Sequence, residues 1–396
     1  MKDLFFGLDD ASRTYWVFTI VLISFVMIPV FYQTLKPASL NRIQSRPLFY
    51  DWRFLIPMLV YSILLGLRYD YSFDWDQYKN TFEYLQRGLL FRDDTEKGYL
   101  FINRCLILCG FNFYSIFILE AIVYVTSYYY LFKDNRKYLL FVMPIVYMAQ
   151  YSNCLNISRQ FFAMSVLFIA YRNLLEGKRI VYFILGLIAC SIHSSAYIWL
   201  IAFYFFKYLN VIRINIKYVF IACLISFIII AYYKTMLYDI LSSMTVLMSS
   251  KSHYEDGQIM DTKYLRDDLQ FSMLLVRFVR TIMYLYLFKI QENLGFFKYS
   301  PIIKNYVLIG LVTYPIVYLM GTHEIFSRMM YYISVMADIG WGVLVYNYFF
   351  KLLKRKIVLW EFFLVFICTF QFFWAYYSQI AVGFFNINTN LFIIYK

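Results

Sequence analysis

The stretch IVYFILGLIACSIHSSAYIWLIAFYFFKY, residues 180–208, decides the fold class of this chain. It holds two apolar runs, and the short polar break Ile192-His193-Ser194-Ser195 lies between them. Apolar runs recur from one end of the chain to the other, and many reach the roughly 17–25 residues that a bilayer core requires. The pattern predicts an all-α, polytopic integral membrane protein.

The composition excludes a soluble globular protein. Of the 396 residues, 62% are hydrophobic, and the mean hydropathy is +0.59. A soluble fold of this length cannot hide that much apolar surface from water. The net charge of +13 does not indicate a nucleic-acid partner, because the basic residues fall mostly in short loops between apolar runs. There, the positive-inside bias of membrane proteins accounts for them.

The basic loops also set the orientation of the predicted spans. They follow every second apolar run, beginning with the first, and loops of this kind belong in the cytoplasm. Both termini then lie outside, and residues 1–396 form a single integral membrane domain with outer loops 68–97 and 235–269. About twelve crossings are expected, and the short stretch 98–110 and the tail 379–396 leave the number open by one or two. The predicted spans are 14–33, 54–67, 111–132, 138–151, 158–172, 180–193, 195–208, 216–234, 270–290, 304–321, 327–349 and 357–378.

Three predicted helix N-termini at the outer face carry a cationic or titratable side chain. These are Arg159, His193 and Arg328, and Arg68 ends the second span at the same face. Free N–H groups and the positive end of a helix dipole favour an anion, and an arginine binds oxygens in pairs. The arrangement predicts a site for an anionic, lipid-borne substrate such as a diphosphate. The alternative is that these arginines anchor helix ends at the interface while neighbouring serines cap the helices.

Two further arginines lie inside the ninth predicted span. Arg277 and Arg280 are three residues apart, so they share one face of a helix. Charges at that depth are costly unless they are paired or face water, and the predicted partners are Glu120 and Asp338, which also lie inside spans. We assign both arginines to the diphosphate site, and a structural ion-pair network is the alternative.

Carboxylates and aromatic residues in the outer loops suit a sugar substrate. The segment Phe73-Asp74-Trp75-Asp76-Gln77-Tyr78 follows Arg68, and a carboxylate there can orient a sugar hydroxyl or remove its proton. No outer loop has a close carboxylate pair with the spacing and neighbours that mark a metal site, so we expect no metal ligands and no cofactor. A solvated acidic loop is the alternative, and it is favoured for Asp76. The predicted proton acceptors are Asp74, Glu324 and His193, and the predicted sugar-binding residues are Trp75, Tyr78 and Gln160.

Several short motifs occur in an order that resembles a known family. They are Gly66-Leu67-Arg68-Tyr69, Asp74 with Tyr78, Glu96-Lys97-Gly98-Tyr99, Ile157-Ser158-Arg159-Gln160, Ile192-His193-Ser194, and Ser327-Arg328 with Tyr331 and Tyr332. Over about residues 55–350 they are similar to the EpsG family of exopolysaccharide and O-antigen polymerases of the Wzy type. The family usually has Gly-Thr-Asp-Tyr near the first motif, whereas this chain has Ser72-Phe73-Asp74-Trp75. The carboxylate is kept and the glycine is not.

The resemblance implies a membrane-embedded, metal-independent glycosyltransferase of GT-C type. Its substrates would be polyprenyl-diphosphate-linked oligosaccharide repeats at the outer face of a bacterial inner membrane. Its partners would be membrane lipid and a chain-length regulator protein, with no nucleic acid. Two other functions remain open, a flippase or transporter for the same lipid-linked glycans and a membrane O-acyltransferase acting on surface polysaccharide. Nothing in the sequence favours a channel or a scaffold.

Overall fold

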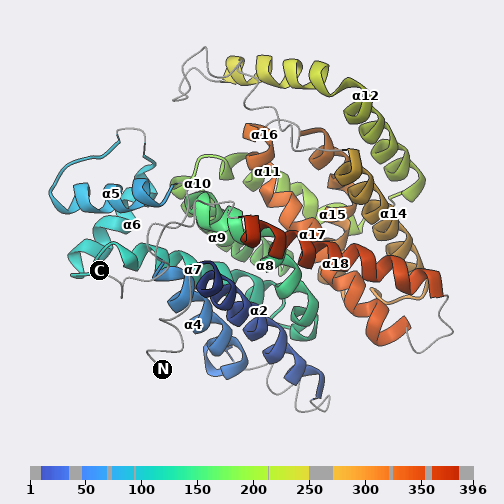
Figure 1. The fold of residues 1–396 in the computed structure, drawn as a ribbon, viewed down its shortest axis with the longest axis horizontal. Helices are drawn as coiled ribbons and strands as arrows, with labels where there is room; N and C mark the ends of the chain where they lie inside the picture. The colour runs from blue at the N-terminus through green and yellow to red at the C-terminus, as the bar shows by residue number, and fades with distance from the viewer. Residues whose placement is uncertain are drawn as a thin grey trace. The chain divides into compact units, whose positions relative to one another are not determined.

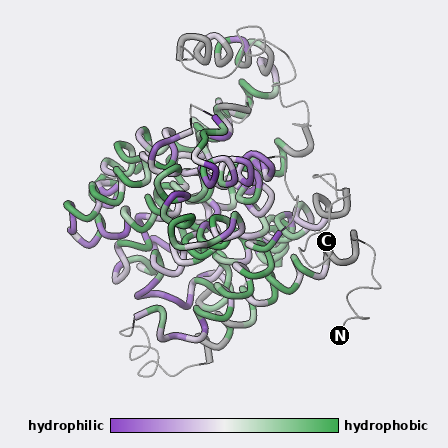
Figure 2. Tube along the Cα trace, turned by 90° about the vertical axis from the view of Figure 1, so that its left-hand side faces the viewer, coloured by the Kyte–Doolittle hydropathy of each residue, from purple (hydrophilic) through white to green (hydrophobic). Residues whose placement is uncertain are grey.

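All regular secondary structure that the structure describes is helical. The computed structural model describes residues 10–34, 47–68, 74–92, 95–212, 214–248, 271–320, 324–352 and 359–382. These ranges contain helices and turns and no strand (Figure 1), and hydrophobic residues run along most of the helices (Figure 2). A helix satisfies its own backbone N–H and C=O groups, which is what an apolar segment in lipid requires. The predicted all-α class is confirmed.

Each of the twelve predicted spans overlaps a described helix. Six described helices are long and apolar enough to cross a membrane, so the chain has the character of a multi-pass membrane protein. The number twelve stays a prediction, because α10 (Arg179–Ile192) and α11 (Ala196–Phe206) are shorter than the roughly 20 residues that a straight crossing needs. The six are α7 (Tyr114–Leu131), α8 (Leu139–Asn156), α12 (Ile216–Met248), α15 (Pro301–Met320), α17 (Tyr331–Asn347) and α18 (Leu359–Val382). The other long helices are α2 (Asp10–Thr34), α4 (Trp52–Gly66), α9 (Ser158–Leu175) and α14 (Phe271–Asn293).

The two predicted outer loops are partly helical. In the first, α5 (Trp75–Gln86) and the beginning of α6 (Lys97–Leu108) replace the expected irregular chain. α5 is amphipathic, because Trp75, Tyr78, Phe82 and Leu85 recur at helical spacing and are buried. α6 is the short helix expected at 98–110. In the second loop, α12 bends at Tyr233 and continues to Met248, so residues 235–248 are helical. The acidic residues of that loop, Glu255 to Asp268, lie outside the described residues.

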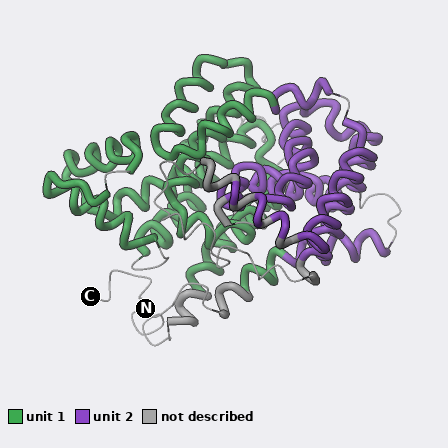
Figure 3. The backbone as a smooth tube through the Cα atoms, turned by 90° about the horizontal axis from the view of Figure 1, so that it is seen from above, with its two compact units in different colours: residues 1–205, 372–396 green, residues 206–371 purple. Residues whose placement is uncertain are grey.

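The chain divides into two compact units (Figure 3). Unit 1 comprises residues 1–205 and 372–396. In it, α7 packs against both α4 and α9, α2 packs against α4 and α8, and α10 packs against α9. Gly66 allows the close approach of α4 and α7, since a Cβ atom there would lie 2.8 Å from Ile118 Cγ1. These helices form the frame that holds the site described below.

Unit 2 comprises residues 206–371. Its core is formed by α15 and α17, with α12 and α14 packed against them. The Tyr284 hydroxyl donates to Val307 O at 2.8 Å and fits into the space that Gly310 and Gly340 leave open. Gln291 donates to Leu344 O at 2.8 Å and accepts from Asn347 at 3.0 Å. Tyr284, Gln291 and Asn347 therefore form hydrogen bonds between the helices of this core.

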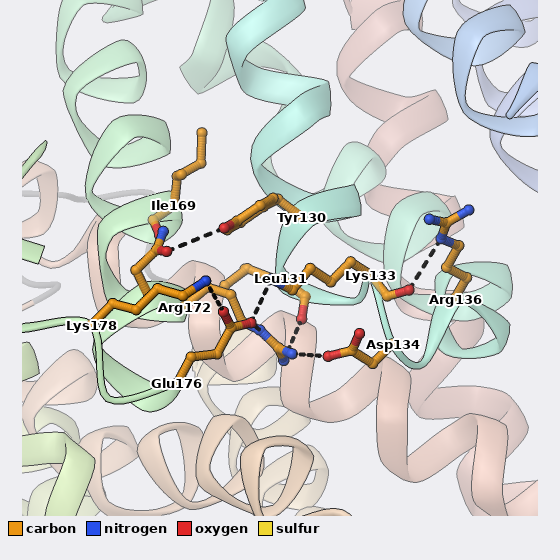
Figure 4. A network of polar contacts seen from close by, with 10 residues as sticks. Tyr130, Leu131, Lys133, Asp134, Arg136, Ile169, Arg172, Glu176 and Lys178 are labelled. Carbon is orange, nitrogen blue, oxygen red and sulfur yellow. Dashed lines mark hydrogen bonds and ion pairs between the residues drawn. The ribbon is translucent and has the colours of Figure 1, made fainter. Parts of the chain in front are cut away.

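A network of ion pairs joins helix ends at one end of unit 1 (Figure 4). Arg172, near the end of α9, donates to Glu176 Oε1 at 2.9 Å and to Leu131 O at 3.2 Å, and it also pairs with Asp134. Lys133 and Lys178 lie 2.5 and 2.9 Å from the Glu176 carboxylate. Burial alone would raise the pKa of Glu176, but hydrogen bonds from Lys133, Lys178 and Arg172 lower it to about 2. The sequence placed these basic residues in separate loops of one membrane face, and the structure brings them together.

We expect Gly98→Ala to destabilise the contact between α6 and α10. A Cβ atom at residue 98 would lie 2.6 Å from both Ser191 C and Ser191 O, and overpacking of this kind costs about 1–3 kcal/mol. The thermal unfolding temperature of the purified protein in detergent should fall. Adding Ser191→Ala should not restore it, because the clash involves the backbone of Ser191. An unchanged unfolding temperature in Gly98→Ala would contradict this packing.

Candidate functional site

A partly exposed ion pair lies at the other end of unit 1. Arg159 is the second residue of α9, directly after the break at Ile157 that separates α8 from α9. Its Nη1 lies 2.8 Å from Glu96 Oε2, and the side chains are 23% and 21% exposed. The guanidinium also lies over the rings of Tyr78 and Tyr99, at 5.8 and 5.6 Å from their centroids. These rings hold the cation by cation–π attraction while its outer edge stays open to solvent.

Glu96 also reaches the turn that joins α10 to α11. Its Oε1 accepts from the backbone N–H of Ser194 at 3.4 Å, and His193 Nδ1 lies 2.8 Å from Ser195 Oγ. Burial lowers the pKa of His193 well below its ordinary value; Glu96 acts to raise that pKa, and Arg159 lowers it further. The ring is therefore neutral near pH 7. One carboxylate thus connects Arg159 with the predicted site residue His193.

The neutral His193 makes stability depend on pH. Because the folded-state pKa is depressed, the contribution of this residue is fully present above the ordinary pKa of about 6.5 and is lost as the pH falls below it. We expect His193→Gln to remove part of the drop in unfolding temperature between about pH 7 and about pH 5. The measurement is the unfolding temperature of the wild type and of His193→Gln across this pH range. Parallel pH curves for the two proteins would contradict a buried neutral histidine.

Arg68 is an interior residue. It is 3% exposed, its guanidinium donates to Leu65 O at 2.9 Å and to Leu155 O at 3.3 Å, and it lies 4.3 Å from the centroid of the Phe117 ring. The backbone O of Arg68 accepts from Trp75 Nε1 at 3.1 Å. Arg68 therefore ties α4 to α8 and to the start of α5, and a role in binding diphosphate stays a prediction.

The predicted sugar-binding residues are buried. Trp75 is 1% exposed and packs against Phe113 and Phe117, so the expectation that its ring offers a face to a sugar is wrong. Tyr78 donates to Asn156 O at 3.1 Å, and Gln160 is also buried. Of the three, the Tyr78 ring lies under the Arg159 guanidinium.

Asp74 and Asp76 do not lie in an extended segment. Asp74 immediately precedes α5, and Asp76 is in its first turn. Asp74 is half-buried and Asp76 is exposed, and the Asp74 N–H donates to Asn156 Oδ1 at 3.3 Å. Asp74 therefore stands beside the break between α8 and α9, next to the segment that carries Arg159.

The other predicted residues belong to unit 2. Arg280 interacts electrostatically with Asp338, as the sequence predicted. The Tyr318 hydroxyl donates to Arg277 O at 2.5 Å. Arg328 lies in the last turn of the short helix α16 (Glu324–Met329) and is half-buried, so the expectation that it stands at the N-terminus of a long helix is wrong. Glu324 begins α16, and its side chain lies outside the described part of the molecule.

Two carboxylates in unit 1 were not among the predicted site residues. Glu96 belongs to the motif Glu96-Lys97-Gly98-Tyr99, but sequence alone did not connect it with Arg159. Glu120 was expected to pair with an arginine of the ninth span. In the structure, its electrostatic partners are Arg68 and Arg159. A single carboxylate in an otherwise apolar span is a strong indication of function.

The fold and the site define a polytopic helical membrane protein with a cation and two carboxylates at one end of a helix bundle. Among the described residues, no group of three or more His, Cys, Asp or Glu side chains could hold a metal ion. Residues 51–390 match the EpsG family, and the chain belongs to that family of exopolysaccharide polymerases of the Wzy type. Comparison with curated proteins and with solved structures gives no match.

Proposed function

We propose that the protein polymerises polyprenyl-diphosphate-linked oligosaccharide repeats at the outer face of a bacterial inner membrane. In each cycle, the growing glycan is transferred from its lipid diphosphate to a sugar hydroxyl of another lipid-linked repeat. The observation that carries the proposal is the partly exposed Arg159–Glu96 pair beside the His193 turn. Membership of the EpsG family agrees with it.

The chemistry needs a cation for the leaving group. As the bond to the donor sugar breaks, negative charge grows on the diphosphate, and a preorganised guanidinium stabilises that charge. Arg159 can take this role when the diphosphate replaces Glu96 as its partner. That Arg328, Arg277 and Arg280 bind diphosphate stays a prediction. Arg68 supports this end of unit 1 from inside.

The acceptor hydroxyl needs a group that orients it or takes its proton. Asp74 is the proposed residue, because it is half-buried beside the segment that carries Arg159. His193, which is neutral near pH 7, and Glu324 are the other proposed candidates. We expect Asp74→Asn to slow polymerisation by about a hundredfold or more while lipid-linked substrate still binds.

A deletion strain distinguishes a polymerase from a flippase. Loss of long polysaccharide with a single repeat unit retained at the surface supports a polymerase. Loss of all repeats would favour a transporter of the same lipid-linked glycan. Purified protein in liposomes then tests the reaction directly, because polyprenyl-diphosphate-linked repeats should be converted into longer chains without any added protein.

A further inference from the structure

A small, partly open cavity lies next to the start of α9, which carries the Arg159–Glu96 pair of unit 1. Residues of α4, α7, α8 and α9 line it, among them Arg68, Glu120, Tyr124 and Ser158. Its volume is about 20 Å³, which is room for about one water molecule. The cavity is therefore too small for a sugar but large enough for one hydrogen-bonding group.

The polar atoms around this cavity lack partners. Both carboxylate oxygens of Glu120, Ser158 Oγ, Tyr124 Oη and Arg68 Nε are buried and accept or donate no hydrogen bond within the described residues. Glu120 as a whole is 6% exposed. Buried polar groups without partners cost free energy, and a polar cavity of this size is typically filled by water that satisfies them. The arrangement points to a bound water held mainly by Glu120.

Two hydroxyls lie near Glu120 and near the Arg159–Glu96 pair. The Tyr99 and Ser158 hydroxyls are neighbours of the Glu120 carboxylate, and neither makes a hydrogen bond among the described residues. The Tyr99 ring lies under the Arg159 guanidinium, and Ser158 directly precedes Arg159 in α9. A proton released near Arg159 therefore has a short route, through a hydroxyl or the cavity water, to a buried carboxylate.

We propose that Glu120 takes up the proton that the acceptor hydroxyl loses, through the Tyr99 or Ser158 hydroxyl. The inference rests on the proposed polymerase function, and it leaves to Asp74 the task of orienting the acceptor. The acceptor oxygen bonds to the anomeric carbon of the donor glycan, the bond from that carbon to the diphosphate breaks, and its electron pair leaves with the diphosphate. The acceptor proton passes to a hydroxyl of Tyr99 or Ser158, and this hydroxyl gives its own proton to Glu120.

The surroundings of Glu120 suit this role. Arg68 and Arg159 are the cations that face it, and they balance its charge while it is ionised. The neutral titratable groups around it come from the packed helices, namely Tyr61, Tyr78, Tyr99, Tyr124 and Cys154. Glu96, the other carboxylate near Arg159, already accepts from Arg159 and from the Ser194 N–H. Both Glu120 oxygens lack a partner among the described residues, so Glu120 can accept the proton.

The test measures the pH dependence of polymerisation by the purified protein in liposomes that contain polyprenyl-diphosphate-linked repeats. Glu120→Gln should lower kcat by about a hundredfold or more, with little change in KM. It should also remove the decline of kcat toward acidic pH. Glu120→Asp keeps a carboxylate and should retain both part of the rate and that decline. The matched control is Glu83→Gln on α5, outside the site.

A different result is expected if Glu120 only stabilises the fold as a countercharge to the two arginines. Glu120→Gln would then unfold at a lower temperature, while its kcat stayed within a few-fold of the wild type and kept the same acidic decline; this result would overturn the proposal. If Glu120→Gln does not fold, Tyr99→Phe combined with Ser158→Ala tests the same route, and an unchanged kcat would overturn it. A wild-type protein that makes no polymer at any pH would instead refute the proposed function.

Discussion

Replacing Arg159 by alanine is expected to abolish polymer formation while the protein still inserts and folds. The side chain makes its ion pair with Glu96 at the surface of unit 1, where both side chains reach solvent, so Glu96 stays in contact with water when its partner is lost. Under the proposed function, the substitution removes the guanidinium that stabilises the diphosphate leaving group. Loss of one such donor costs about a hundredfold to a thousandfold in rate.

A lysine variant distinguishes the charge of Arg159 from the geometry of its donors. Arg159→Lys keeps the charge but loses the planar pair of donors, so it should recover little of the rate. Polysaccharide length on gels and the rate of polymerisation in liposomes are the measurements. The matched control is Arg104→Ala, which removes an exposed arginine from α6 in the same unit and should leave polymer length unchanged. Full-length polymer from Arg159→Ala, at a normal protein level, would exclude a role in binding the diphosphate.

Replacing Arg172 by alanine is expected to cause the largest loss of stability. Arg172 is 1% exposed and joins the end of α9 to Leu131 O, Asp134 and Glu176 (Figure 4). Removing Arg172 takes away hydrogen bonds to all three partners, and a hydrogen bond of a charged group contributes about 1.5–3 kcal/mol. Glu176 keeps Lys133 and Lys178 as partners. We expect a lower protein level in membranes and a lower unfolding temperature in detergent.

Arg179→Ala provides the control for this variant. Arg179 is exposed at the start of α10, and a surface substitution away from such a network usually changes stability by no more than about 0.5 kcal/mol. The unfolding temperature of Arg172→Lys should lie between those of Arg172→Ala and Arg179→Ala, since lysine keeps a charge but cannot reach all three partners. Equal unfolding temperatures for Arg172→Ala and Arg179→Ala would show that the network contributes no stability.

The sequence could predict where the helices are, because the bilayer imposes a length and a composition on each of them. All twelve expected spans overlap a helix. The prediction from sequence missed two helical segments that lie outside the long apolar runs. α5 is an amphipathic helix in an acidic segment, and α12 continues past the apolar run to Met248. Local amphipathic spacing indicates the first, and apolar residues at helical spacing, Leu237, Ile240, Leu241, Met244 and Met248, indicate the second.

The site could be predicted only in part. The sequence placed Arg68, Arg159 and His193 at one end of their helices, since alternate spans return to the same face, and in unit 1 the structure brings these three residues to one end. It could not predict that Trp75 packs against Phe113 and Phe117, because that contact depends on how α5 meets the start of α7 and not on the spacing along α5 alone.

By itself, the sequence determined the helical membrane class, the order of the helices and the helix ends that carry charge, all of which follow from hydropathy and loop charge along the chain. Only the tertiary structure decided which charges meet. Glu96 and Arg159 are 63 residues apart, and Glu120 faces Arg68 and Arg159 from another helix. Such pairings depend on how α4, α6, α7 and α9 pack side by side, and packing is set by side-chain shape between helices, which no local pattern along one chain records.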